Sequence, residues 1–157
     1  TNNFYLIFGS FFYEPIGKGL LEVLKVLNET NIHVKITGFG SDAIFNGIDY
    51  ALNKNLEPLG ETTPSELNDL LATCKGVIIN QALSSGALTK LKELQIAGVP
   101  AVLNEASTRS FKNTHGFHVY HDFTELKALL VKDLSMPNLP GDNDFYDNRV
   151  LEIVNTL

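Results

Sequence analysis

The chain has 157 residues, the length of one domain, and its 44% hydrophobic content argues against a disordered chain. Its formal net charge of −6 argues against a basic face that binds nucleic acid, so no nucleic-acid partner is expected. The single cysteine, Cys74, excludes an internal disulfide framework and predicts a reducing, cytoplasmic location.

The longest apolar runs have the length of strands, far below the roughly 20 residues that a membrane helix needs. We therefore expect no membrane span. The chain begins with Thr1 and enters a strand at once, without an initiator Met, which suggests a fragment of a longer protein.

Strand-like and helix-like segments alternate along the chain, which predicts a parallel sheet covered by helices. Strands are expected at residues 4–8, 32–37, 56–59, 76–80, 100–103 and 117–120. Helices are expected at residues 17–27, 42–52, 64–74, 87–97 and 123–132. The predicted fold class is α/β, a three-layer Rossmann-like parallel sheet of about six strands with helices on both faces.

Two local signals support this order of elements. Residues 4–8 form an unbroken apolar run, typical of a strand that is buried on both faces. Thr63, Pro64 and Glu66 supply an N-cap hydroxyl, a proline in the first turn and a glutamate three residues after the cap, which together start a helix. Residues 1–134 are expected to form the domain, and residues 135–157 a linker and a C-terminal helix from 145 to 157.

Open parallel sheets bind ligands at the carboxyl ends of their strands, so the loops after strands are the candidate sites. The first loop ends in Gly17-Lys18-Gly19 and resembles a phosphate loop only superficially. Seven residues separate Gly9 from Gly17 where the ATPase motif needs four, and Gly19 stands where that motif needs a hydroxyl. Lys18 either only starts a helix or contacts an anion, and both interpretations remain open.

A G-x-G-x-x-A pattern follows the second expected strand, formed by Gly38, Gly40 and Ala43, and Glu57 lies about 20 residues further on. In dinucleotide-binding domains this pattern normally follows the first strand, and the turn that it forms holds the pyrophosphate. Here a full strand-helix unit precedes the pattern. A tight turn that packs helix on strand is therefore favoured. An NAD(P)-binding domain of a dehydrogenase is kept as an alternative.

Three histidines, His115, His118 and His121, are spaced three residues apart. Imidazoles suit zinc, but residues three apart along a strand point to opposite faces, so one face cannot present all three. We expect no metal and no cofactor.

Residues 80–100 carry the strongest signal in the chain. A strand ends at Asn80, a loop of small polar residues follows, and Gly86 precedes a helix whose free N–H groups attract phosphate. Lys90 and Glu93 lie three residues apart on one face of that helix. The pair either holds a nucleoside diphosphate or is an exposed Lys-Glu pair on an amphipathic helix.

The order of motifs resembles the C-terminal, nucleotide-sugar-binding half of GT-B fold glycosyltransferases of the E-x7-E type, over residues 4 to about 130. The matching motifs are F-G-S at residues 8–10, I-T-G-F-G at 36–40, L-G-E at 59–61 and G-A-L-T-K-L-K-E-L-Q-I-A-G-V-P at 86–100. The last is similar to a variant, G-x-x-x-K-x-x-E-x-x-x-x-G-x-P, in which the helix binds the nucleotide of an activated sugar.

The resemblance implies roles for individual residues. Glu93 matches the second glutamate of the motif, which holds the ribose hydroxyls, and Ser85 stands in place of the first. Lys18 resembles the basic residue that meets the diphosphate, so Lys18 and Glu93 are the implied catalytic residues. The implied substrate-binding residues are Gly9, Ser10, Lys18, Gly38, Leu59, Gly60, Ser84, Ser85, Gly86, Lys90 and Glu93.

The same resemblance implies a donor-binding domain whose N-terminal, acceptor-binding domain is absent. Its partner would be a UDP- or GDP-linked sugar in polysaccharide biosynthesis, and the full-length enzyme is a candidate for peripheral membrane association. The fragment alone would transfer little or no sugar. A non-catalytic, receiver-like interaction module is kept as a further alternative, although Gly9 and Ser10 stand where such a module carries acids.

Overall fold

The computed structural model describes residues 3–48, 51–82, 89–109 and 114–138 of the chain. These residues form the strands β1 (Tyr5–Phe8), β2 (Val34–Thr37), β3 (Leu56–Gly60), β4 (Gly76–Ile79), β5 (Ala101–Asn104) and β6 (Phe117–Tyr120). Between them lie the helices α1 (Glu14–Leu27), α2 (Ser41–Asn46), α3 (Pro64–Thr73), α4 (Thr89–Ile96) and α5 (Phe123–Leu130), and the short 3-10 helix η1 (Glu105–Thr108).

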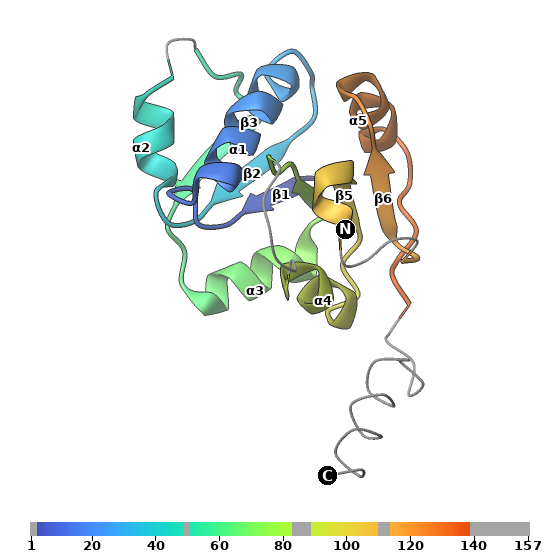
Figure 1. Cartoon of the computed structure of the whole chain (residues 1–157). Coiled ribbons are helices and arrows are strands. Elements are labelled where there is room, and N and C mark those ends of the chain that lie inside the picture. The colour runs from blue at the N-terminus through green and yellow to red at the C-terminus, as the bar shows by residue number, and fades with distance from the viewer. Residues whose placement is uncertain (1–2, 49–50, 83–88, 110–113, 139–157) are drawn as a thin grey trace, which may run out of the picture.

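All six strands belong to one parallel sheet in the order β3-β2-β1-β4-β5-β6 (Figure 1). The chain starts in the middle of the sheet, builds outward to β3, and then returns to the other side of β1 through β4. This arrangement confirms the predicted α/β fold class with six parallel strands and helices on both faces.

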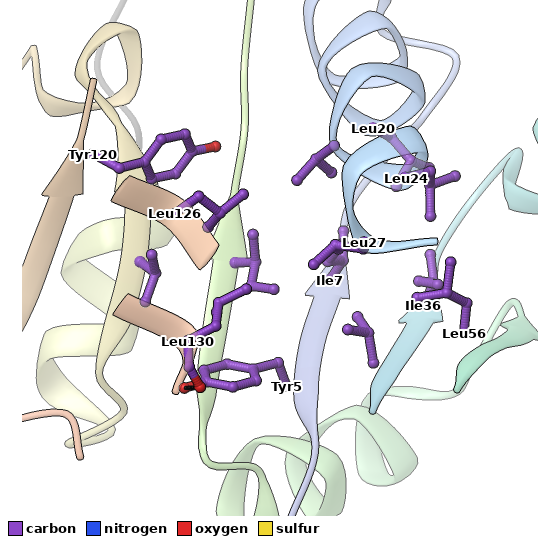
Figure 2. Close-up of a cluster of buried hydrophobic side chains, with 14 of the residues drawn as sticks. Tyr5, Ile7, Leu20, Leu24, Leu27, Ile36, Leu56, Tyr120, Leu126 and Leu130 are labelled. Carbon is purple, nitrogen blue, oxygen red and sulfur yellow. Dashed lines mark hydrogen bonds between the residues drawn. The ribbon is translucent and has the colours of Figure 1, made fainter. Parts of the chain in front are cut away.

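Alternate side chains of the central strand β1 supply two separate cores. Tyr5 and Ile7 point to one face, where the helices α1 and α5 pack, and Figure 2 shows Leu24 of α1 and Leu130 of α5 in this cluster. Leu6 points to the other face, in a cluster with buried leucines of α4 and partly buried leucines of α3. Each fully buried leucine contributes about 1.5–3 kcal/mol, so both faces of the sheet must be covered for the domain to fold.

The observed bounds correct some expected ones. Helix α1 begins at Glu14, earlier than residue 17, because Pro15 is tolerated in a first turn, where the N–H groups have no intrahelical acceptor. Helix α2 ends at Asn46 with Gly47 as its C-cap, not at residue 52. The predicted capping box is confirmed at α3, where the Thr63 hydroxyl accepts from Glu66 N–H and the Glu66 carboxylate accepts from Thr63 N–H.

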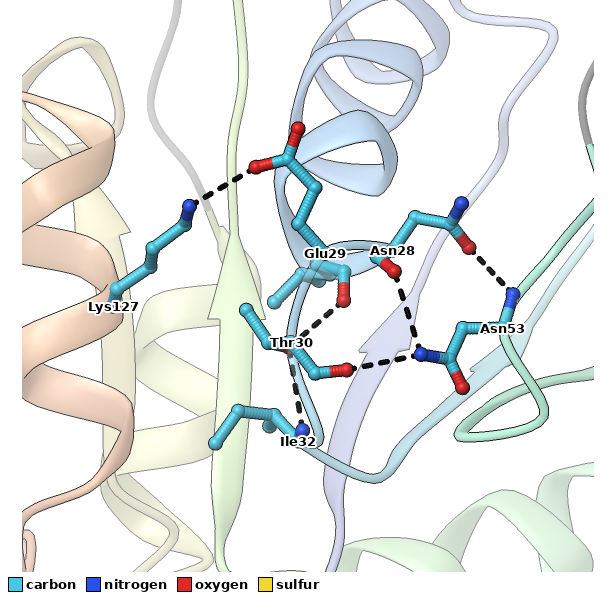
Figure 3. Close-up of polar contacts among 7 residues, drawn as sticks. Asn28, Glu29, Thr30, Ile32, Asn53 and Lys127 are labelled. Atoms are coloured by element: carbon cyan, nitrogen blue, oxygen red, sulfur yellow. Dashed lines mark hydrogen bonds and ion pairs between the residues drawn. The ribbon is translucent and has the colours of Figure 1, made fainter.

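After the early end of α2, residues 51–53 lead into a turn at 54–55 before β3, and Asn53 binds the turn after α1 (Figure 3). Its side-chain amide donates to the carbonyls of Asn28, at 3.4 Å, and Thr30, at 3.2 Å, and its backbone N–H donates to the Asn28 side chain. The same turn carries Glu29, which forms an exposed ion pair with Lys127 of α5 at 3.2 Å. These contacts fix the carboxyl end of α1 between α5 and the segment that precedes β3.

Replacing Asn53 by alanine leaves the carbonyls of Asn28 and Thr30 without their amide donor. Because these groups are partly buried, we expect Asn53→Ala to lower the free energy of unfolding by about 1–3 kcal/mol, measured by urea denaturation. Lys127→Ala, which removes an exposed ion pair, is the control and should cost less than about 1 kcal/mol. Equal losses in the two variants would contradict this account of the turn.

Candidate functional site

The sheet reverses its winding direction between β1 and β4, which are neighbours although β2 and β3 separate them in the chain. In open parallel sheets the connections after two such strands leave to opposite faces, and a crevice forms outside their carboxyl ends. The described residues at this point are Gly9 and Ser10 after β1, and Asn80, Gln81 and Ala82 after β4. This edge of the sheet is the candidate functional site.

Lys90 is the cation that the structure brings to this edge. It lies in the first turn of α4, and its ammonium group donates a hydrogen bond to the carbonyl oxygen of Phe8, the last residue of β1. The ammonium nitrogen also lies 4.3 Å from the centre of the Phe8 ring. Gly9 leaves room for it, since a Cβ atom there would lie 3.1 Å from the ammonium nitrogen.

Burial makes the positive charge of Lys90 costly. It lowers the pKa of Lys90 from the usual 10.5 to about 8, although the nearby carboxylate of Glu93 acts in the opposite direction. A lysine with this pKa is mostly protonated at neutral pH but only weakly stabilised in that form. An anion beside the Lys90 ammonium would supply the missing stabilisation.

A small cavity lies inside the same edge, with a volume of about 20 Å³, room for a single water molecule. Its walls are apolar side chains of β1, β4 and α1 together with Asn80, Gln81 and Lys90. A nucleotide cannot enter a space of this size. Any such ligand must therefore lie outside the cavity, across the strand ends.

Asn80 fixes the chain where it leaves β4. Its side-chain amide donates to the Gly19 carbonyl at 2.8 Å, and its side-chain oxygen accepts a hydrogen bond from the Tyr120 hydroxyl at 2.7 Å. A Cβ atom on Gly19 would overlap the Asn80 carbonyl oxygen, so α1 approaches this loop at a distance that only glycine permits. Burial, and secondarily Glu22, raise the pKa of Tyr120, which keeps its hydroxyl protonated as the donor.

Sequence reasoning missed these positioning contacts, and it also missed Asn104, whose side chain pairs with the backbone of Gln81 in both directions, at 3.2 and 2.8 Å. The available signal was a polar residue at the carboxyl end of a buried strand, directly after β4 at Asn80 and as the last residue of β5 at Asn104. Such a residue can bond the neighbouring loop instead of the ladder. The pattern does not reveal which loop.

Three glycines meet at the β1–β2–β3 side of the edge. Gly38 adopts a φ of 139°, and a Cβ atom there would overlap the Gly9 carbonyl oxygen. The backbone N–H of Gly38 donates to the Gly60 carbonyl at 3.0 Å, which also accepts from the Thr37 hydroxyl at 2.8 Å. The structure thus brings the predicted site residues Gly9, Gly38, Gly60 and Lys90 to one edge, and Leu59 precedes Gly60 in β3.

The remaining predicted site residues are exposed on the surface or lie outside the described chain. Lys18 lies on the exposed surface of α1 and pairs with Glu14 at 2.6 Å, which raises the pKa of Lys18 and lowers that of Glu14. Ser10 and Glu93 are exposed. The expected phosphate cup of Ser84, Ser85 and Gly86 lies outside the described residues, as does the C-terminal helix expected at residues 145–157.

The glycine pattern around Gly38 serves the packing of two loops, as the tight-turn interpretation predicts. The space beside Gly38 is filled by the Gly9 backbone. Glu57, the expected ribose ligand of a dehydrogenase, lies inside β3, where it accepts from His33 at 3.2 Å and lies 3.9 Å from Lys35. This placement is two strands away from the switch point between β1 and β4, and it argues against the dinucleotide alternative.

The three histidines near β6 have separate partners. His115 bonds the Met136 carbonyl at 2.8 Å, His118 faces Ser135 at 3.3 Å, and His121 pairs with Glu125 at 2.9 Å. Among the described residues, no group of three or more histidine, cysteine, aspartate or glutamate side chains is arranged to hold a metal ion. In all the residues that the structure describes, no helix has the length and apolar character required to cross a membrane.

The strand order and the switch-point crevice define a Rossmann-like α/β domain, and comparison with known proteins agrees with this class. No protein-family model and no curated protein sequence matches the chain. Several solved structures share its fold, including the following three. One is TarM, with a TM-score of 0.63 and 20% sequence identity over 82% of this chain and 28% of TarM.

The second structure is AviGT4, a glycosyltransferase involved in avilamycin A biosynthesis, with a TM-score of 0.62 and 20% identity over 87% of this chain and 43% of AviGT4. The third is UDP-GlcNAc 2-epimerase from Methanocaldococcus jannaschii in complex with UDP-GlcNAc and UDP, with a TM-score of 0.54 and 13% identity over 98% of this chain and 45% of the epimerase. The chain therefore spans less than half the length of each of these three structures. At these identities the likeness shows the fold.

The depressed pKa of Lys90 has a measurable consequence for stability. Below pH 8 the folded protein holds a poorly solvated charge, and this cost declines from pH 8 toward 10.5, where only the unfolded chain keeps the proton. We expect Lys90→Met to raise the free energy of unfolding at pH 7 by about 1–3 kcal/mol, and to raise it less at pH 9.5. Urea denaturation at the two pH values measures this, and a destabilised variant at pH 7 would contradict it.

A second prediction concerns the contact between Gly38 and Gly9. Gly38→Ala adds a methyl group that overlaps the Gly9 carbonyl, at a φ of 139° that non-glycine residues avoid. We expect a loss of at least about 3 kcal/mol of unfolding free energy, measured by thermal and urea denaturation. Gly98→Ala is the control, because its φ is also positive, at 68°, but nothing lies within 4 Å of the added atom. Similar losses in both variants would show that backbone conformation alone accounts for the effect.

Proposed function

We propose that the chain is the donor-binding domain of a glycosyltransferase and binds a nucleotide-diphosphate sugar at the crevice between β1 and β4. The observation that carries the proposal is the position of the Lys90 ammonium, held at the carboxyl end of β1 by the Phe8 carbonyl. Support comes from the fold, which is shared with a glycosyltransferase and with an epimerase crystallised with UDP-GlcNAc and UDP.

In this proposal the diphosphate lies across the ends of β1 and β4, beside Gly9 and Lys90. The absence of a side chain at Gly9 lets a phosphate approach the backbone, and the Lys90 ammonium offsets its negative charge. When the bond to the sugar breaks, charge develops on the departing diphosphate, and a fixed cation stabilises that charge in the transition state. Glu93 would accept hydrogen bonds from the ribose, and the backbone of Leu59 and Gly60 would contact the base.

The remaining assignments follow the resemblance to GT-B glycosyltransferases of the E-x7-E type. Ser84, Ser85 and Gly86 would complete the phosphate seat, and Ser10 would stand near the diphosphate. Lys18 would reach the diphosphate only after leaving Glu14, with which it now pairs. We therefore assign the principal cation of the site to Lys90 and a secondary one to Lys18.

The acceptor-binding part of the enzyme would lie in a domain that precedes this one in the full protein. The chain covers 28–45% of the length of the three structures described above, which is compatible with a separate acceptor-binding domain in a longer protein. We expect residues 1–134 to form the donor domain, in a cytoplasmic enzyme of polysaccharide biosynthesis. The domain alone should bind nucleotide and transfer little or no sugar.

Isothermal titration calorimetry with UDP and GDP tests the proposal. We expect the chain to bind at least one of them at pH 7, and Lys90→Met to weaken that binding at least about tenfold, because it removes the cation from the diphosphate seat. Lys92→Met is the matched control, since Lys92 lies two residues further along α4 and faces another direction. Equal affinities for the Lys90→Met variant and the parent chain would overturn the proposed seat.

The affinity for the nucleoside diphosphate should also depend on pH. Above pH 8 the free protein loses the Lys90 proton, and binding must then restore it before the cation can act. We expect the UDP affinity of the parent chain to fall between pH 7.5 and 9.5, by up to about tenfold per pH unit at the upper end. Lys90→Met should show no comparable fall over this range, and a parallel fall in both proteins would assign the effect to another group.

A further inference from the structure

Two phenylalanines form an exposed pair beside the diphosphate seat. Phe12 follows β1 and Phe39 follows β2, and their side chains are 63% and 57% exposed. Their ring centres lie 5.0 Å apart with an angle of 69° between the rings, an edge-to-face contact. Neither the fold nor the proposed phosphate contacts require large apolar side chains at these two positions.

The pair is held in place by the backbone beneath it. A Cβ atom on Gly40 would lie 2.8 Å from the Phe12 ring, so the ring rests directly on the backbone of this glycine, whose φ is 82°. The backbone N–H of Phe11 donates to the Phe39 carbonyl at 2.8 Å, which ties the two loops together. Because the two side chains are already held in place, a ligand that stacks on them binds with little further loss of side-chain entropy in the protein.

The position of the pair is defined by three glycines. Gly38, next to Phe39, packs against the Gly9 carbonyl, and Gly9 adjoins the Lys90 ammonium. On its other side Gly38 donates to the Gly60 carbonyl. The pair thus lies on the β2 side of the diphosphate seat, toward β3 and Gly60, where the proposed function expects the base.

The size of the pair favours a small flat ligand over a protein partner. A phenylalanine side chain buries about 150–250 Å² when fully covered, so two that are a little over half exposed offer roughly 200–300 Å². A stable protein interface needs about 800 Å² from each partner. An aromatic base stacked on one ring requires no more area than the pair offers.

We propose that Phe39, supported by Phe12, stacks on the base of the nucleoside diphosphate bound at Lys90. The inference rests on the proposed function, and it adds an aromatic contact to the backbone contacts expected from Leu59 and Gly60. Stacking accepts any base because every base has a flat face. The contact therefore contributes affinity for UDP and GDP alike, and the choice between them lies with hydrogen bonds elsewhere.

The test compares a ligand that has a base with one that lacks it. Calorimetric titrations of the full chain with UDP and with inorganic pyrophosphate are made for the parent and for Phe39→Ala. We expect Phe39→Ala to weaken UDP binding at least about fivefold, the lower end of what alanine substitution costs at stacking sites, and to leave pyrophosphate binding unchanged. Phe39→Trp should keep or improve the UDP affinity. Tyr13→Ala is the control, because Tyr13 is 48% exposed in the same loop as Phe12.

Several results would overturn the inference. Unchanged UDP affinity in Phe39→Ala, or equal loss of UDP and pyrophosphate affinity, would show that the base does not stack on Phe39. If UDP-GlcNAc lost affinity while UDP did not, the stacked ring would be the sugar. Self-association of the parent that Phe39→Ala abolishes, with UDP binding intact, would assign the pair to a second copy of the chain. Failure of the parent to bind either UDP or GDP would instead refute the proposed function itself.

Discussion

The candidate site depends on backbone approaches that only glycine allows. The Gly9 carbonyl occupies the space where Gly38 would carry a side chain, and the Asn80 carbonyl does the same at Gly19. These two contacts draw the loops after β1 and β2 together and bring α1 against the loop after β4. The strand ends of the switch point are therefore fixed before any ligand arrives, which reduces the cost of ordering them on binding.

At this edge Lys90 carries a positive charge that burial makes unfavourable, so the charge lowers the stability of the free domain. The Lys90 ammonium is desolvated, and among the described residues it has one carbonyl partner, Phe8, whose neutral oxygen compensates only partly for the lost hydration. In the proposed function, a diphosphate bound beside this ammonium offsets the cost of the buried charge. The surface pair of Lys18 and Glu14 has no comparable desolvation cost, because both side chains are exposed and already paired.

The fold was largely predictable because it follows from local patterns. Buried runs such as residues 4–8 define parallel strands, and the Thr63–Glu66 capping box defines a helix start to the residue. The site was less predictable, since side-chain direction depends on tertiary packing. Nothing in the sequence indicates that Lys90 reaches Phe8, or that Asn80 joins Gly19 to Tyr120. The pairing of Lys18 with Glu14 is an i, i+4 contact that was missed because the helix was expected to begin only at residue 17. The end of α2 at Asn46 escaped prediction because Asn53 ties the segment before β3 to a distant turn, through contacts that the local sequence pattern does not reveal.

A crystal structure of this chain grown with UDP tests the central claim most directly. The account predicts the diphosphate at the carboxyl ends of β1 and β4, with a phosphate oxygen within about 3 Å of the Lys90 ammonium nitrogen. The claim would be contradicted by UDP bound at the opposite, amino edge of the sheet, or by a diphosphate held through other residues while Lys90 keeps only the Phe8 carbonyl as its partner.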